Sequence, residues 1–245
     1  MSNPPAFLGT GVRFPFHPGS DGGFAFISGE DLVAQSIILV ALIGLVLFGA
    51  AGRLDVPAFW VYLALWLGAS MVSVAVVDPT LYQERIRPGG RRLRAVYWLL
   101  MVPLVLHLVV AGVDVGRYHW SDAVPQALQW LGMLVFAAGW GLTLWAMHVN
   151  RFFSSVVRIQ EERGHQLVSS GPYAWVRHPG YVAGLLVIVS SGVALGSWLS
   201  LVPVVLMLPM LLVRTAREDR FLKQNLPGYR DYAAKVRYRL LPGIW

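Results

Sequence analysis

The sequence predicts an all-α integral membrane protein with about six transmembrane helices. Of its 245 residues, 56% are hydrophobic and 13% are charged, whereas soluble domains contain about a quarter charged residues. The mean hydropathy is +0.57. Several apolar runs are also long enough, at about 20 residues, to cross a hydrocarbon core of about 30 Å as a helix. Composition and run length therefore give the same fold class.

Four apolar runs each predict one transmembrane helix, and a fifth predicts two. The fifth run, 181–213, has no charged residue before Arg214, and it is too long for one ordinary span. "GSW" at 196–198 and Pro203 interrupt it, which favours a hairpin of two closely joined helices. We expect the second of these helices to continue to Leu226. The four single spans are predicted at 32–51, 56–77, 95–113 and 124–149.

The basic residues predict that both termini are cytoplasmic. In a six-span arrangement, all but two of the 20 Lys and Arg residues fall on one side of the membrane, and the two exceptions are Arg53 and Arg117. Such a bias marks the cytoplasmic side. We therefore expect a multi-pass protein, of the inner or plasma membrane if the source is bacterial. The net charge of +7 then reflects topology, and no nucleic-acid partner is predicted.

Several classes of site lack their sequence patterns. The chain has no cysteine, and its six histidines show no HxxxH spacing, so no metal site is predicted. It also has no glycine-rich nucleotide-binding turn and no GxSxG. His107 lies inside a predicted span, where a histidine either serves function or bonds a neighbouring helix.

The polar chemistry is concentrated in residues 150–245, which follow a first part, 1–149, of plain helices. The hairpin returns the chain to the side it left, so it brings the segment from His165 to Tyr181 close to the positions around Arg214. Aromatic rings beside carboxylates suit a flat cationic ligand. Pro179 fixes His178 at the mouth of the first hairpin helix. Residues 229–241 have the spacing of an amphipathic helix on the membrane surface.

These motifs resemble the isoprenylcysteine carboxyl methyltransferase family of integral membrane enzymes, which is related to phospholipid N-methyltransferases. "HQLVSSGPYAWVRHPGYV", a hairpin, and Arg214 followed by Glu218 and Asp219 are similar to the family's pattern, and the resemblance covers about 150–245. It implies S-adenosylmethionine as cofactor. It also implies that 150–245 is the methyltransferase core and that 1–149 faces the substrate.

The resemblance further implies roles for individual residues. Arg214 would face an acidic group of the substrate, with Glu218 and Arg177 as the other catalytic candidates. Glu218 or Asp219 would hold the amino or ribose end of the cofactor. At the second acidic position the family usually has Glu, so Asp219 is one methylene shorter. The remaining cofactor-binding candidates are His165, Leu167, Val168, Gly171, Tyr173, His178 and Tyr181.

The expected acceptor is a lipophilic molecule that enters from the bilayer. A carboxylate of the isoprenylcysteine type is favoured, and a phospholipid amine or a small hydrophobic thiol or acid stays open. Two other interpretations of the chain are an NADPH-dependent enzyme similar to membrane sterol reductases and a membrane scaffold without catalysis. Binding of S-adenosylmethionine or of NADPH would separate them.

Overall fold

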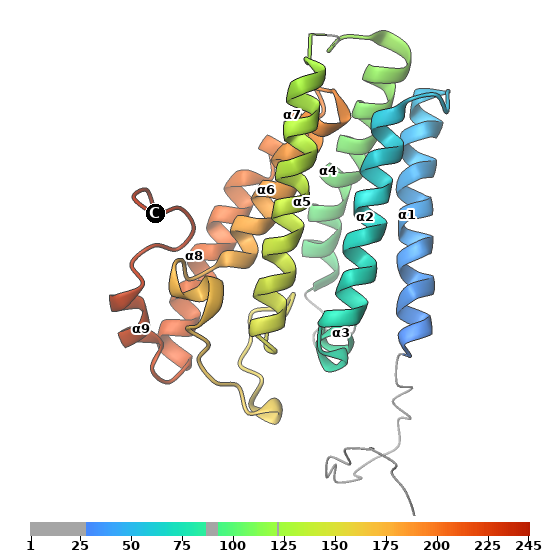
Figure 1. The fold of residues 1–245 in the computed structure, drawn as a ribbon. Helices are drawn as coiled ribbons and strands as arrows, with labels where there is room; N and C mark the ends of the chain where they lie inside the picture. Colours follow the sequence, from blue (N-terminus) through green and yellow to red (C-terminus); the bar gives the residue numbers. More distant parts are fainter. Residues whose placement is uncertain (1–27, 87–92, 122) are drawn as a thin grey trace, which may run out of the picture.

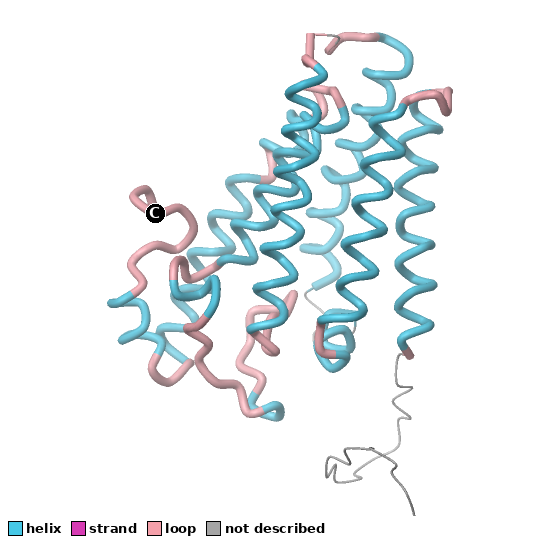
Figure 2. The backbone as a smooth tube through the Cα atoms, viewed as in Figure 1, coloured by secondary structure: helices cyan, strands magenta, loops and turns pink. Residues whose placement is uncertain are grey.

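The computed structural model describes residues 28–86, 93–121 and 123–245, and within these ranges it consists of helices and loops without strands (Figure 2). The predicted all-α class is confirmed. Helices α1, α2, α4 and α5 form a bundle, from which α6 and α8 lean away toward the lower end (Figure 1). The elements are α1 (Gly29–Ala51), α2 (Pro57–Val76), α3 (Pro79–Ile86), α4 (Leu93–Val113), η1 (Asp114–Tyr118), α5 (Gln126–Val149), η2 (Glu161–Arg163), η3 (Gly171–Ala174), α6 (Pro179–Leu195), α7 (Leu201–Val205), α8 (Leu208–Asn225) and α9 (Tyr229–Lys235).

The four single spans are present within a few residues of their predicted limits. The helices long and apolar enough to cross a membrane are Gly29–Ala51, Pro57–Val76, Met101–Tyr118 and Gln126–Val149. Local signals set their ends. At the start of α1, Ser28 Oγ accepts a hydrogen bond from the Asp31 N–H at 3.1 Å, and the Asp31 carboxylate accepts from the Ser28 N–H at 3.0 Å. This capping box satisfies two N–H groups that the helix leaves without partners.

The predicted hairpin is present, although its second leg is interrupted. Helix α6 ends at Gly196, whose φ of +82° permits the left-handed conformation that reverses the chain. The second leg begins as α7, breaks at Leu206 and Met207, and resumes as α8. Pro209, in the first turn of α8, explains the break because its ring has no N–H to continue the preceding helix. Pro203 lies within α7 rather than at the interruption, and α8 ends at Asn225, next to the predicted limit.

Helices α5 and α6 pack closely because glycines of α5 face α6. At Gly132, a Cβ atom would lie only 2.7 Å from the backbone nitrogen of Ala194. At Gly139, a Cβ atom would lie 2.9 Å from Val187. Small residues permit this approach, which in a membrane depends on van der Waals contact. The first hairpin helix is thus held firmly against the bundle.

Hydrogen bonds around His107 join α2, α4 and α6 to the hairpin turn. His107 Nδ1 lies 2.8 Å from the carbonyl oxygen of Ser200, which can only accept, so this nitrogen carries the proton. His107 Nε2 then accepts from Ser191 Oγ at 2.8 Å, and the Tyr62 hydroxyl donates to Ser191 Oγ at 2.8 Å. All donors are satisfied, so His107 is explained by the second of its two predicted roles, a bond between helices.

Asp114 fixes the same turn from the other side. Its side chain is fully buried, and its two oxygens accept from Ser197 Oγ at 2.5 Å and from the Ser121 N–H at 2.9 Å. Ser121 Oγ in turn accepts from the Trp198 N–H at 3.1 Å. A buried carboxylate is tolerated when its oxygens are hydrogen-bonded in this way. The upper end of the hairpin is therefore anchored to η1.

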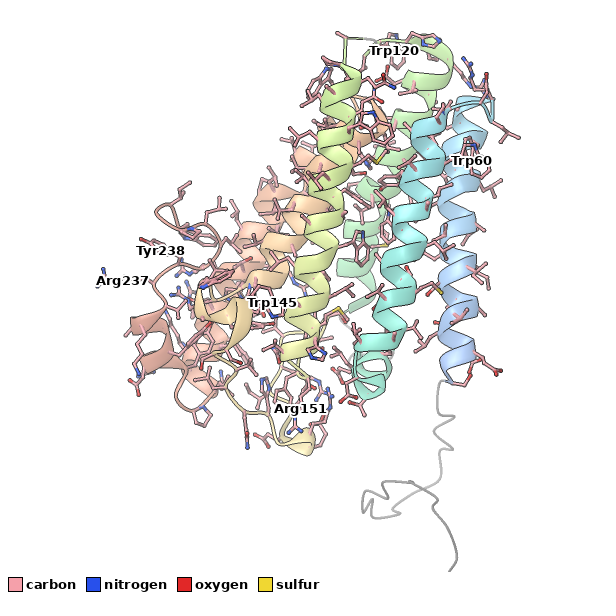
Figure 3. The ribbon with its side chains drawn as sticks, viewed as in Figure 1. Trp60, Trp120, Trp145, Arg151, Arg237 and Tyr238 are labelled. Atoms are coloured by element: carbon pink, nitrogen blue, oxygen red, sulfur yellow. The ribbon has the colours of Figure 1, made fainter. Side chains whose placement is uncertain are left out.

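Charged and aromatic side chains lie at the two ends of the molecule, as expected for a protein that spans a membrane. Arg117 lies at the upper end, where its Nε donates to the Ala50 carbonyl at 2.6 Å. Trp60 and Trp120 are exposed near that end, and Arg151 lies at the lower end (Figure 3). Exposed tryptophans at a bundle end are typical of a membrane interface. Arg13, Arg87, Arg91 and Arg92 belong to the predicted cytoplasmic set but lie outside the described residues.

The C-terminal helix is shorter than predicted, and its aromatic residues do not face the membrane. Helix α9 ends at Lys235, and the chain then runs as loops and turns to Trp245. Tyr229 and Tyr232 are buried among residues of α8 and of the loop before α6. The prediction of a surface helix over 229–241 is therefore wrong. Its amphipathic spacing reflects burial against the protein.

The fold predicts the sides from which two engineered cysteines react. Trp198 is partly exposed in the hairpin turn and Ser169 is exposed in the loop before α6, and the chain has no cysteine of its own. With an impermeant maleimide on intact cells, Trp198→Cys should be labelled directly. Ser169→Cys should react only after permeabilisation. Labelling of both from one side would contradict the arrangement.

The His107 bonds predict a loss of stability on truncation. His107→Ala should lower the free energy of unfolding by about 1–3 kcal/mol, because Ser191 and the Ser200 carbonyl lose a buried partner. Thermal or denaturant unfolding in detergent measures this. His148→Ala is the matched control, since its ring also bonds one carbonyl, that of Val76 at 3.0 Å, but is exposed. Equal losses in the two variants would refute the prediction.

Candidate functional site

The candidate site forms at the lower end of the hairpin, where the loop after α5, the start of α6, α8 and the C-terminal segment come together (Figure 1). The loop turns into η3 at Gly171, whose φ is +58°. In η3, the buried Tyr173 accepts a hydrogen bond from Asn150 Nδ2 at 3.0 Å, and its carbonyl accepts from the Tyr232 hydroxyl at 2.7 Å. Burial raises the pKa of Tyr173 above its usual value, so the phenol stays neutral.

Asp219 is the centre of the polar contacts. Its side chain is 1% exposed and accepts from Arg177 Nε at 2.8 Å, from Arg239 Nε at 3.0 Å and from the Tyr229 hydroxyl at 3.1 Å. Lys223, one turn further along α8, places its ammonium 3.2 Å away. A buried carboxylate needs this number of donors to offset lost hydration. Asp219 thereby ties together α6, α8, α9 and the C-terminal segment.

The protonation state of Asp219 follows from these contacts. Burial alone would raise the pKa of the carboxyl group. The His178 imidazole, the Arg239 guanidinium, the Arg177 charge and the Lys223 ammonium act in the opposite direction and hold the pKa of Asp219 well below its usual value. Asp219 is therefore a carboxylate at neutral pH.

Arg177 is enclosed by the protein, although the family resemblance made it a catalytic candidate. Its side chain is 5% exposed. Its Nη1 donates to the carbonyls of Val236 at 2.7 Å and of Arg237 at 2.8 Å, and more weakly to that of Ala233 at 3.3 Å. The backbone N–H of Arg177 donates to the Tyr238 carbonyl at 3.0 Å. These bonds satisfy carbonyls at the end of α9 and attach Arg177 to the C-terminal segment.

A second polar group consists of Arg214, Tyr181 and Glu218. Arg214 Nε donates to the Tyr181 hydroxyl at 2.7 Å, and that hydroxyl donates to Glu218 Oε2 at 2.6 Å. Arg214 Nη2 donates to the carbonyl of Ser155 in the loop after α5. Its Nη1 has no hydrogen bond among the described residues. The Glu218 side chain is 26% exposed, so it remains accessible where Asp219 is not.

His178 lies between the two acids. It precedes α6, and its backbone N–H donates to the Arg239 carbonyl at 3.0 Å. The ring places Nδ1 3.8 Å from Glu218 and Nε2 3.6 Å from Asp219, both beyond good hydrogen-bond distance. Nε2 is buried and has no hydrogen-bond partner within the described part of the chain. A buried polar atom of this kind points to a partner from outside the protein chain.

The other predicted residues lie on the loop side of this group. His165 stacks on Phe152 with 4.5 Å between ring centres, and its Nδ1 accepts from the Gln160 N–H at 3.3 Å. Burial, with the Arg163 charge next, lowers the pKa of His165. Leu167 packs against the cluster that contains Tyr229. Val168 is partly buried.

The prediction missed three residues that hold Asp219. Lys223 and Arg239 counted only as cytoplasmic charges, and Tyr229 was assigned to the membrane face. The four-residue spacing of Asp219 and Lys223 on one helix is a signal that the sequence carries. No local pattern connects Arg239 or Tyr229 with Asp219, because the turn at Gly228 and the return of the C-terminal segment bring them together.

The arrangement can bind a ligand that has both cationic and anionic parts. Glu218 offers an accessible negative charge. Within the described residues, Arg214 has a guanidinium nitrogen without a hydrogen bond, and His178 has an imidazole nitrogen without one. Tyr181 joins the first two and fixes their separation. The described residues contain no group of three or more side chains suited to a metal ion.

Comparisons with known proteins cover much of the segment that contains this site. Residues 130–224 match the model of the isoprenylcysteine carboxyl methyltransferase family. A nickel-cobalt-cadmium resistance protein of Alcaligenes xylosoxydans xylosoxydans is 31% identical over 145 residues, which are 57% of this chain and 60% of that protein. A cobalt-zinc-cadmium resistance protein of Cupriavidus metallidurans is 34% identical over 139 residues, 54% of this chain and 58% of that protein.

A further relative carries an enzyme's name. A probable protein-S-isoprenylcysteine O-methyltransferase of Oryza sativa is 39% identical over 89 residues, 36% of this chain and 47% of that protein. The chain thus spans about 60% of the length of the first two relatives. The matched segment contains the loop before α6, the hairpin and the acidic pair of α8. Residues 130–224 are thus similar to the isoprenylcysteine carboxyl methyltransferase family.

Proposed function

We propose that this protein is a membrane methyltransferase that transfers a methyl group from S-adenosylmethionine to a lipophilic acceptor with an anionic group, such as an isoprenylcysteine carboxylate. The observation that supports it most directly is the hydrogen-bonded series Arg214–Tyr181–Glu218. It places a cation-binding group and an anion-binding group a fixed distance apart at the membrane boundary. The match of residues 130–224 to the family model and the name of the rice relative support the same reaction.

The residues fit the proposed cofactor. The unpaired His178 Nε2 would gain a partner, and the accessible Glu218 carboxylate would hold the cationic end. His165, Leu167 and Val168 would lie along the adenosine, while Gly171, Tyr173 and Tyr181 would complete the pocket. Asp219 has its oxygens occupied by protein donors, so we assign the binding of the cofactor's amino end to Glu218. When bound, S-adenosylmethionine supplies a methyl group activated by a positive sulfonium.

The protein's own contribution is orientation and exclusion of water. A carboxylate acceptor needs no general base, and an amine acceptor would need one. Arg214 would hold the acceptor carboxylate through Nη1 while its Nε stays on Tyr181. A cationic donor and an anionic acceptor lose charge as they react, so a water-poor site favours the transition state. Orientation of this kind can lower the barrier by about 7–11 kcal/mol.

The proposal is tested with the purified protein and with its native membranes. Calorimetry should show saturable binding of S-adenosylmethionine and none of NADPH. Methyl-labelled S-adenosylmethionine should then transfer its label to a lipophilic product, whose identification gives the acceptor. NADPH binding would favour the reductase interpretation, and cofactor binding without any transfer would favour the scaffold.

Arg214→Lys should lower turnover by about tenfold or more while the affinity for S-adenosylmethionine changes little. A lysine cannot keep the Tyr181 and Ser155 bonds and still present a planar donor to a carboxylate. Steady-state kinetics with the identified acceptor measure the effect. Arg217→Lys, an exposed neighbour on α8, is the matched control and should resemble wild type. If Arg214→Lys turns over at the control rate, Arg214 only anchors the helix at the interface.

Glu218→Gln should weaken S-adenosylmethionine binding by about tenfold, since hydrogen bonds to a charged group contribute about 1.5–3 kcal/mol. Calorimetry measures the dissociation constant. Asp219→Asn should instead lower the unfolding temperature, because it removes the charge that pairs with Arg177 and Arg239. Asp231→Asn on the exposed face of α9 controls for loss of one acidic charge. A larger loss of cofactor affinity in Asp219→Asn than in Glu218→Gln, at full folding, would reverse our assignment.

A further inference from the structure

The loop that carries the Arg214 contact has little secondary structure of its own. Between Asn150 and Gly171 only η2 is helical, so side-chain contacts must fix its path. Several of these contacts do not come from α6, α8 or α9. They come from α3, a short helix in the first part of the chain, outside the segment that matches the family.

Helix α3 is seated firmly on the bundle. Leu81 is fully buried and packs with Val77 and with Met147 near the end of α5. Phe153, in the loop, packs against the same cluster. Its position at the lower end of the bundle places α3 beside the start of the loop (Figure 1).

Glu84 of α3 binds the loop at two points. Its side chain is 8% exposed, and Arg158 donates to both of its oxygens, from Nε at 3.1 Å and from Nη2 at 2.6 Å. Ser154 Oγ also donates to Glu84 at 2.9 Å. A buried carboxylate with a two-pronged guanidinium contact fixes geometry more strictly than an exposed ion pair does.

A second contact supports the same attachment. Arg163 Nη2 donates to Thr80 of α3 at 2.7 Å, and Nη1 donates to Gln160 at 2.6 Å. Gln160 is fully buried, and its backbone N–H donates to the His165 ring. Helix α3 therefore restrains the loop on both sides of Arg158 and up to a residue of the proposed cofactor pocket.

Glu84 is connected with Arg214 through two adjacent residues of the loop. Ser154, which donates to Glu84, is followed by Ser155, whose carbonyl accepts from Arg214 Nη2. Arg214 then continues to Tyr181 and Glu218. Release of Glu84 would free the Ser155 carbonyl to move, and the Arg214 guanidinium would lose one of the two bonds that orient it.

We infer that Glu84 is a positioning residue of the methyl-transfer site, which acts through Arg158 and the Ser154–Ser155 segment to orient Arg214. The inference rests on the proposed function for its kinetic consequences only. The attachment of the loop to α3 is a property of the fold and can be measured without any substrate. Sequence comparison within 130–224 does not reach Glu84, because it precedes that segment.

The attachment is tested with a nitroxide spin label on the cysteine introduced by Glu161→Cys, an exposed position on the loop. In the otherwise unchanged full-length protein the label should give a broad line. With Glu84→Gln the line should narrow. With Glu162→Gln, the matched control, it should stay broad, because Glu162 also contacts Arg158 at 2.7 Å but is 57% exposed and does not reach α3. An unchanged line in Glu84→Gln would overturn the inference, whatever reaction the protein catalyses.

The link to Arg214 is tested by a double-mutant cycle on methyl transfer. Glu84→Gln alone should lower kcat by about tenfold, with the affinity for S-adenosylmethionine held within about threefold of wild type. In the Arg214→Lys background, Glu84→Gln should lower kcat hardly any further, since the effects of residues that act through one another are not additive. Fully additive effects would show that Glu84 only stabilises the fold and would overturn the inference.

If Glu84→Gln does not fold, Arg158→Lys is used in its place. This substitution keeps the positive charge but removes the two-pronged contact, so the line narrowing and the loss of kcat expected for Glu84→Gln are expected for it too. Absence of methyl transfer in the wild-type protein would refute the proposed function. The spin-label result would still decide whether α3 holds the loop.

Discussion

The contact between Arg177 and the buried carboxylate of Asp219 holds the lower part of the molecule together. Asp219 belongs to the second leg of the hairpin, and Arg177 immediately precedes the first. The Arg177 guanidinium also donates to the carbonyls at the end of α9, so its hydrogen bonds are made within the protein. This pair thus fixes the distance between the two legs of the hairpin. The other bonds of Arg177 bind the end of α9 and hold the C-terminal segment next to His178.

The same pair explains why the two adjacent acids of α8 differ in exposure. Glu218 and Asp219 follow one another on α8, yet one is partly exposed and the other is enclosed. The aspartate side chain is shorter by one methylene than the glutamate usual in the family. In this enclosure the shorter side chain meets Arg177, Arg239 and Tyr229 at hydrogen-bond distance. The longer neighbour, Glu218, stays partly exposed.

Much of the fold could be predicted because apolar length is a direct signal in a membrane. The four single spans, the turn near Gly196 and the end of α8 all follow from runs of apolar residues and from Gly and Pro. The C-terminal segment was mispredicted because tyrosine spacing does not distinguish a lipid surface from a protein surface. Only the buried partners of Tyr229 and Tyr232 make that distinction.

The site was predictable to the extent that its residues lie in two short motifs. Their closeness required only that the hairpin return to its starting side. The partners supplied by Glu84, Arg239 and the Ser155 carbonyl could not be predicted, since each comes from a segment without a pattern of its own. The family resemblance made Arg177 a catalytic candidate, and no sequence pattern indicates the three backbone carbonyls that its Nη1 contacts.

The broken second leg of the hairpin has a mechanical consequence. Helix α6 is pressed against α5 through glycines and carries His178 and Tyr181 at its lower end. Helix α8 resumes after the break at Leu206 and Met207, and among the helices it packs chiefly against α9. The turn is anchored at Asp114, and the lower part of α8 is tied through Asp219 to Arg177. Bending of this leg is therefore confined to the break between these two fixed ends.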